Sequence, residues 1–164
     1  MATPAGYTRT QIRLHWIIVG LVALQYVFKD AISQAWADWL NGAEIAFNPM
    51  IAQHVFLGAL VALLTIWRLA LRFSHGAPAP AGTESAPGKA KVALATQWAF
   101  YALMLLMPIS GSVAWFGGAE GAATAHNILK FVLLALIALH VVGALVQQFV
   151  QKTNVMARMK HPVA

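Results

Sequence analysis

The chain has 164 residues, of which 60% are hydrophobic and only 10% are charged, and this excludes an ordinary soluble domain, which carries about 25% charged residues. Cysteine is absent, so disulfides and thiolate metal sites are excluded as well. The net charge of +6 does not indicate nucleic-acid binding, because the basic residues lie at the ends of apolar runs rather than on one polar face.

Four stretches are long and apolar enough to cross a bilayer, which requires about 20 residues per helix. They cover residues 11–31, 50–72, 92–116 and 124–150. The first is too long for the apolar core of a signal peptide and lacks a convincing small-residue cleavage site. Short links between helices make antiparallel neighbours. The sequence therefore predicts one all-α transmembrane domain over residues 1–164, an up-down-up-down four-helix bundle.

The links between the stretches differ in character. Residues 33–50 hold Trp36, Trp39 and Phe47 among polar residues, which predicts a short helix at the outer interface. Residues 74–91 are rich in Pro, Gly and Ala and predict a flexible link.

The distribution of charge predicts the orientation. All positive residues except Lys29 and Lys130 lie at the N-terminus, at the C-terminus or around the link between the second and third stretches. The positive-inside rule therefore places both termini in the cytoplasm. On the opposite side lie four of the five acids, namely Asp30, Asp38, Glu44 and Glu120.

Four histidines fall inside the predicted spans. His126 and His140 are 14 residues apart, so they share one helix face and lie roughly 21 Å apart along the axis. His15 lies near the cytoplasmic start of the first span, and His54 near the outer start of the second. Matching by depth therefore pairs His54 with His126 at the outer side and His15 with His140 at the inner side.

Two imidazoles between facing helices, with no carboxylate beside them, suit haem iron. Zinc requires a further donor or a water, and a di-iron site requires glutamates, which the spans lack. The pattern predicts two haem b groups, and the absence of a CxxCH motif excludes covalent attachment. The alternative is that each histidine forms an ordinary interhelical hydrogen bond. A lone histidine favours that alternative, but two depth-matched pairs favour haem.

Other residues share the histidine faces. Gly58 and Gly143 could admit a flat macrocycle, or could serve close helix packing. Arg68 and Arg72 lie on the His54 face at the depth of the inner pair, where they could bind haem propionates or simply flank the span.

The sequence indicates the roles of the remaining lysines and histidines less strongly. Lys130 shares the His126 face and could pair a propionate or guide an anion, and a snorkelling lysine is the alternative. Lys29 is the second candidate anion guide. His75 and His161, in the link and the tail, have no partner in the pattern and are expected to be solvated.

Five segments together resemble a known family. They are YTRTQIRLHW, QHVFLG, WRLALRF, YALMLLMPISG and HNILKFVLLALIALHVVGALVQQFVQKTNVMARM. In this order they resemble the bacterial cytochrome b561 family of di-haem membrane proteins over nearly the whole chain. The resemblance implies a multi-pass protein of the bacterial inner membrane, with haem ligands at His15, His54, His126 and His140.

The chain departs from the family at two places. Relatives often have histidines where this chain has Gln97 and Trp98, and again at Gln147 and Gln148. None of these is a haem ligand in the family, so the departures concern proton or quinone roles.

The resemblance also implies an activity. For the best-known type it is superoxide oxidation at the outer face coupled to ubiquinone reduction, which makes the chain a superoxide:ubiquinone oxidoreductase. Arg13, Arg72 and Lys152 are candidates for the quinone site. The rival is a relay subunit that passes electrons from a periplasmic dehydrogenase or cytochrome, docked near Trp36 and Trp39, to quinone. A purely structural scaffold is the third reading. Oligomeric state and electron direction stay open.

Overall fold

The computed structural model describes residues 3–81 and 87–163, and these residues form helices without any strand. The long helices and the short helix that follows the first are, in chain order, α1 (Arg9–Val27), α2 (Asp30–Leu40), α3 (Pro49–His75), α4 (Pro87–Gly117) and α5 (Glu120–Leu145). Helix α5 continues as a π-helical turn, η1 (Val146–Val150), and a 3-10 helix, η2 (Val155–Met159), follows. The all-α class predicted from the sequence is therefore confirmed.

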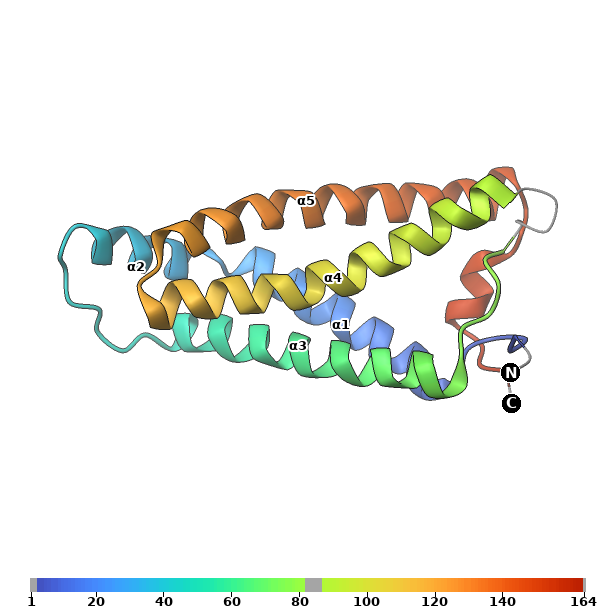
Figure 1. The fold of residues 1–164 in the computed structure, drawn as a ribbon, viewed down its shortest axis with the longest axis horizontal. Helices are drawn as coiled ribbons and strands as arrows, with labels where there is room; N and C mark the ends of the chain where they lie inside the picture. The colour runs from blue at the N-terminus through green and yellow to red at the C-terminus, as the bar shows by residue number, and fades with distance from the viewer. Residues whose placement is uncertain (1–2, 82–86, 164) are drawn as a thin grey trace.

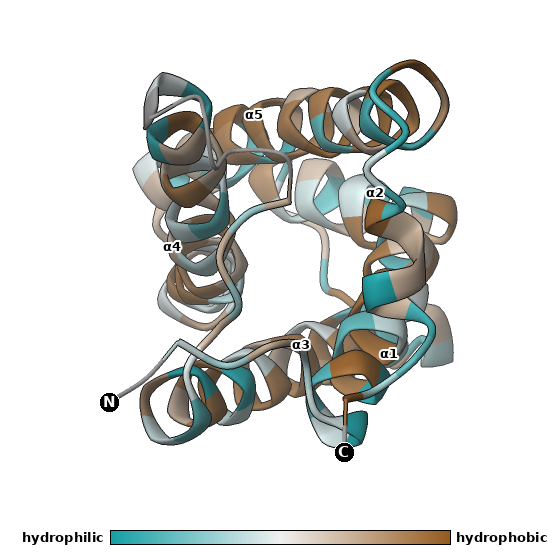
Figure 2. Ribbon diagram, turned by 90° about the vertical axis from the view of Figure 1, so that its right-hand side faces the viewer, coloured by the Kyte–Doolittle hydropathy of each residue, from teal (hydrophilic) through white to brown (hydrophobic). Residues whose placement is uncertain are grey.

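The four long helices lie lengthwise beside one another, and successive ones run in opposite directions (Figure 1). One end of the molecule, here called the terminal end, holds both chain termini. The opposite end, the α2 end, holds α2 and the turn from α4 to α5. Viewed end-on, α1 lies beside α3, α3 beside α4, and α4 beside α5 (Figure 2).

Three helical segments are each long and apolar enough to cross a membrane, namely Pro49–His75, Gly88–Gly117 and Glu120–Val150. Helix α1 meets the same measure only together with α2, from which it is bent by 49°. The predicted first span, residues 11–31, therefore extends past the end of α1 and into α2. The short helix expected within residues 33–50 is present as α2, although it begins earlier, at Asp30.

Local signals explain where α1 and α3 begin. Thr8 caps α1 by accepting from the backbone N–H of Gln11, whose side chain bonds back to Thr8. Asn48 caps α3 by accepting from the N–H of Met50, and Pro49 occupies the first helical position, where its missing N–H costs nothing. Helix α3 ends at Gly76, whose φ of 76° favours glycine.

The buried core lies in the middle of the molecule and takes residues from all four long helices. Its members are Ile18 and Val22 of α1, Val61 of α3, Leu103 and Met104 of α4, and Leu133 of α5. Each of these residues lies in the middle part of its helix, away from both ends of the molecule. An apolar layer therefore separates the α2 end from the terminal end.

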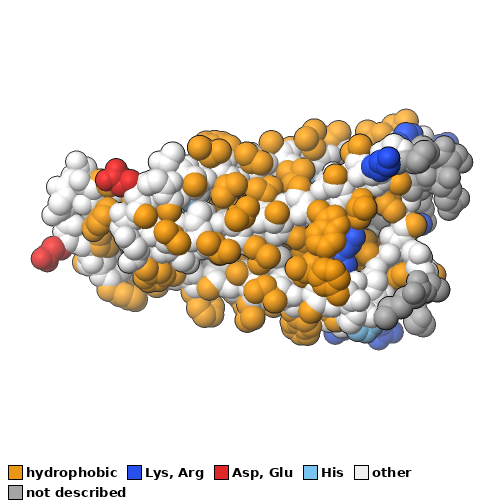
Figure 3. All heavy atoms as spheres, viewed as in Figure 1, with side chains coloured by type: hydrophobic (Ala, Val, Ile, Leu, Met, Phe, Trp, Pro, Cys, Tyr) orange, Lys and Arg blue, Asp and Glu red, His pale blue; other side chains and the backbone are white. Residues whose placement is uncertain are grey.

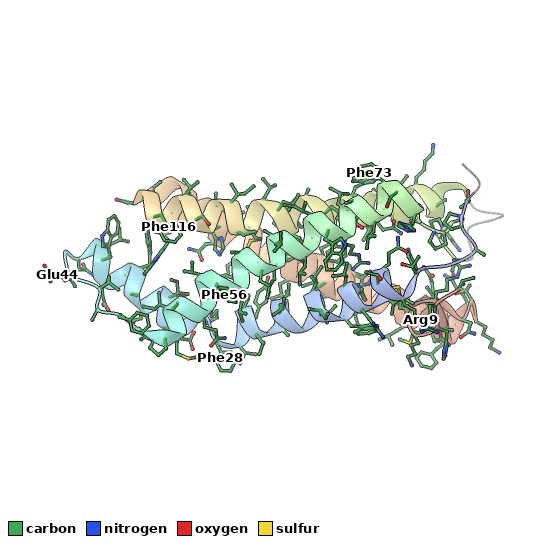
Figure 4. All side chains as sticks on the ribbon, turned by 90° about the horizontal axis from the view of Figure 1, so that it is seen from below. Arg9, Phe28, Glu44, Phe56, Phe73 and Phe116 are labelled. Carbon is green, nitrogen blue, oxygen red and sulfur yellow. The ribbon has the colours of Figure 1, made fainter. Side chains whose placement is uncertain are left out.

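The surface is divided in the same way. On the face in Figure 3, hydrophobic side chains cover the length of the helices, Lys and Arg lie toward the terminal end, and acidic side chains lie at the α2 end. Figure 4 shows Arg9 and Glu44 at these opposite ends. An apolar surface around the middle of the molecule, between charged ends, is expected of a membrane protein.

The C-terminal tail folds back across the terminal end. The indole N–H of Trp16 donates to the Met159 carbonyl at 2.8 Å, and Arg158 donates to the Ala79 carbonyl at 2.7 Å. The Val163 N–H bonds the Tyr7 carbonyl at 3.2 Å. Burial raises the pKa of Tyr7, against the opposing effect of nearby arginines, so its phenol is neutral at physiological pH.

Candidate functional site

His54 and His126, the pair predicted for the outer haem, line one cavity of about 440 Å³ at the α2 end. His54 comes from the second turn of α3 and His126 from the second turn of α5. Gly58 and Gly111 also line this cavity. The structure therefore brings this predicted pair to a common space.

The ring of His126 is fixed by α4. Its Nδ1 lies 2.9 Å from the Met107 carbonyl, which only accepts, so Nδ1 carries the proton and donates. The Ser110 hydroxyl lies 3.3 Å from the same nitrogen. A Cβ on Gly111 would lie only 3.1 Å from the ring, so glycine permits this approach. With Nδ1 protonated, Nε2 keeps its lone pair and is free to bind a metal.

His54 is fixed by α1. The side-chain amide of Gln25 donates from Nε2 to the His54 carbonyl at 2.9 Å. A Cβ on Gly58 would lie 3.1 Å from the same Nε2, so Gly58 lets the amide reach α3. His54 Nδ1 and Gln25 Oε1 are both buried without a hydrogen-bond partner in the described structure.

His15 and His140, the pair predicted for the inner haem, face each other at the terminal end. Their ring centroids are 6.5 Å apart, with an angle of 68° between the planes. A metal–imidazole bond is about 2 Å long, so this separation leaves room for one metal ion between the rings. Phe100 of α4 packs edge-on against His140 at 5.3 Å and supports its ring.

The two arginines of the α3 face have different contacts. Arg68 Nη1 lies 2.9 Å from His15 Nδ1, and because a guanidinium only donates, that nitrogen accepts. Arg72 lies one turn further on and contacts α4. It donates to Gln97 at 2.7 Å and lies over the Trp98 ring at 5.1 Å. Of the two, only Arg68 contacts the histidine pair.

Both candidate anion guides, Lys29 and Lys130, line the cavity at the α2 end, but they differ in whether a carboxylate pairs with the charge. Lys29 is paired with Asp30 at 2.6 Å, which neutralises it locally. Lys130 donates to the neutral amide of Asn127 at 3.0 Å and lies over the Phe131 ring at 5.0 Å, so its charge is not cancelled by a carboxylate.

The other predicted residues make fewer contacts. In the part of the chain that the structure describes, no heavy atom outside α5 lies within 4 Å of a Cβ built on Gly143, which leaves open space beside α5 near His140. Arg13 and Lys152 are exposed, and neither has a side-chain hydrogen bond or ion pair within the described residues.

The donor sets fit haem. Within residues 3–81 and 87–163, no group of three or more His, Cys, Asp or Glu is arranged to hold a metal ion. Each pair offers two imidazoles, and a haem supplies the other four nitrogens that a six-coordinate iron requires. A bare zinc ion would need further protein donors.

Sequence reasoning missed Gln25, Ser110 and Gly111. Gln25 is an amide within the otherwise apolar residues 16–28, and the free-energy cost of burying an amide there is a usable signal. Ser110 and Gly111 follow a proline inside α4, but their contact with His126 depends on how α4 packs against α5.

Comparison with known proteins decides the family. The family model for prokaryotic cytochrome b561 matches residues 6–162. The chain belongs to the prokaryotic cytochrome b561 family. It is also 38% identical over 162 residues to a protein of Cereibacter sphaeroides named cytochrome b562, covering 99% of each chain. The resemblance seen in the sequence is confirmed, and membership of this family makes the chain a multi-pass, haem b membrane protein of electron transfer.

Proposed function

We propose that this cytochrome b561 carries two haem b groups, one at each end of the bundle, and moves electrons between the two sides of the bacterial inner membrane. The observation that carries the proposal is the pair of two-histidine sites. His54 and His126 share a cavity at the α2 end, and His15 faces His140 at 6.5 Å at the terminal end. The apolar core lies between the two.

The chain acts as one domain over residues 1–164 and crosses the membrane four times, with α1 and the first residues of α2 in the first span and the rest of α2 at the outer interface. Both termini are cytoplasmic, because the positive residues gather at the terminal end (Figure 3). The α2 end is then periplasmic.

The protein residues hold and insulate the cofactors. His54 and His126 would hold the outer haem, and His15 and His140 the inner haem. Bound haem supplies one-electron oxidation and reduction of its iron. With two imidazoles bound, each iron would have no position free for oxygen, so substrates would exchange electrons without binding the metal.

Superoxide is the proposed electron donor, and ubiquinone the acceptor. Each superoxide gives up one electron and leaves as oxygen, and two electrons with two cytoplasmic protons convert ubiquinone to ubiquinol. Lys130 supports this choice, because its uncancelled charge lines the periplasmic cavity and attracts a small anion. Lys29 contributes less, because Asp30 pairs with it.

A relay between a periplasmic donor protein and quinone is the alternative, and a different observation favours it. The α2 end is acidic apart from Lys29 and Lys130, and it exposes 43% of Trp39 and 86% of Phe47. Exposed aromatic side chains among charges are typical of protein docking surfaces.

Quinone reduction is assigned to the terminal end. Arg72 is the best placed of the three candidates, because its guanidinium is held between Gln97 and the rings of Trp98 and Tyr101, at 5.1 and 5.9 Å. Arg13 and Lys152 are exposed at the same end and remain secondary candidates.

The function is tested by stopped-flow visible spectroscopy of the purified, oxidised holoprotein mixed with superoxide. Rapid appearance of reduced b-type bands, discharged by added ubiquinone, is the expected result. Haem bands that superoxide leaves oxidised would select the relay, and a protein without haem bands would overturn both.

Arg68 gives a separate prediction about the inner site. Arg68 lies beside the inner pair, where its guanidinium would pair a haem propionate, so we expect Arg68→Leu to bind the inner haem about 10-fold more weakly. Haem retention during detergent dilution measures this. Arg72→Leu is the matched control, because Arg72 contacts α4, and it is expected to retain both haems. Equal losses in the two variants would contradict a specific role for Arg68.

A further inference from the structure

Two buried polar atoms at the α2-end cavity lack hydrogen-bond partners, and they are complementary. His54 Nδ1 is a potential donor, and Gln25 Oε1 is an acceptor. Buried polar atoms in proteins are nearly always paired, so each orphan requires an explanation. Both residues line the same cavity, and the Gln25 amide is already anchored 2.9 Å from the His54 carbonyl through its other atom, Nε2.

His126, the second histidine of this cavity, shows the effect of a hydrogen bond at Nδ1. His126 Nδ1 donates to the Met107 carbonyl at 2.9 Å, which leaves Nε2 unprotonated. His54 has no carbonyl in that position within the described structure, and its Nδ1 is unpaired. When Nε2 of a neutral imidazole binds a metal, its single proton must sit on Nδ1. In an apolar span that proton requires an acceptor, and Gln25 Oε1 is the unpaired acceptor of an amide that already bonds the His54 carbonyl.

We propose that Gln25 is a positioning residue for the outer haem, in which its Oε1 accepts the Nδ1 proton of His54 while its Nε2 holds the His54 carbonyl. The carboxamide thereby fixes the His54 tautomer and ring orientation and raises the basicity of Nε2. Gly58 is part of the same device, because any side chain there would meet the Gln25 amide at 3.1 Å. The inference rests on the proposed outer haem site.

The test compares Gln25→Leu with Gln25→Glu in the full-length holoprotein. Leu removes both the acceptor and the donor, whereas Glu keeps an acceptor oxygen. We expect Gln25→Leu to weaken retention of the outer haem about 10-fold and to raise its midpoint potential, because a less basic ligand stabilises ferric iron less. Gln25→Glu is expected to retain the haem, with a potential equal to or below that of the unchanged protein.

Gln34→Leu and Gln34→Glu are the matched controls, because Gln34 is exposed on α2 and its side chain donates to Asp38 rather than to a histidine pair. They are expected to leave both potentials in place, and the inner haem of every variant reports whether the bundle has folded. If Gln25 served only as a donor to the His54 carbonyl, Gln25→Glu and Gln25→Leu would shift the potential in the same direction, and this would overturn the proposal. Shifts no larger than those of the Gln34 variants would also overturn it.

His54→Ala separates this inference from the function on which it rests. Loss of one haem in His54→Ala, with unchanged behaviour in both Gln25 variants, would reject the role of Gln25 alone. Retention of both haems in His54→Ala would reject the outer site itself.

Discussion

Replacing His126 with Ala is expected to remove one haem from the protein and leave the other, and replacing His140 is expected to remove the other one. The reason is that the two residues belong to separate pairs, with Leu133 of the buried core between them on the same helix. His126 shares a cavity with His54, whereas His140 faces His15 at 6.5 Å. Loss of one imidazole leaves the iron with one protein ligand, and we expect its haem to be lost on purification.

Haem-to-protein ratios and electron paramagnetic resonance of the low-spin signals measure this result. Each variant should fall from two haems per chain to about one, and different signals should disappear in the two variants. His161→Ala is the control, because His161 lies in the exposed tail and is expected to leave both haems in place. Equal loss of both haems from either variant, in a protein that keeps its helical content, would contradict separate sites.

The sequence was sufficient for the helical class and for the pairing of the histidines. Spacing along α5 puts His126 and His140 on one face by helical geometry alone. His15 and His54 each lie near the start of their helix, and because α1 and α3 begin at opposite ends of the molecule, each histidine meets a different partner. These inferences need only the helical period and the depth of each residue along its span. Both are enough to pair residues because membrane-spanning helices lie roughly parallel to one another.

The parts that could not be predicted depend on how neighbouring helices rotate. The helical period placed Arg68 and Arg72 on one face of α3. Of the two, only Arg68 reaches His15, because Gln97 and Trp98 of α4 bind Arg72. Position on a helix gives a direction but not the competing partner. The break between α1 and α2 was missed because the predicted span, residues 11–31, runs across Lys29 and Asp30, where the helix axis bends by 49°.

The second prediction concerns Gly111, which the sequence marks only as a glycine that follows Pro108. We expect Gly111→Leu to lose the outer haem and keep the inner one. Even a Cβ at this position would lie 3.1 Å from the His126 ring, and a larger side chain would displace the ring from the Met107 carbonyl. Overpacking of this kind costs about 1–3 kcal/mol, so a lower melting temperature is expected as well.

Gly117→Leu is the matched control, because Gly117 lies on the same helix and, among the described residues, no atom outside that helix lies within 4 Å of an added Cβ. It is expected to keep both haems. Gly111→Ala should fall between the two, since a shift of the ring by a few tenths of an ångström would relieve its contact. A graded loss of the outer haem across Ala and Leu, with the inner haem constant, would show that the orientation of His126, rather than general stability, is what Gly111 protects. If Gly111→Leu kept the outer haem, the ring would not need its present position, and the bond to Met107 would have no part in holding the cofactor.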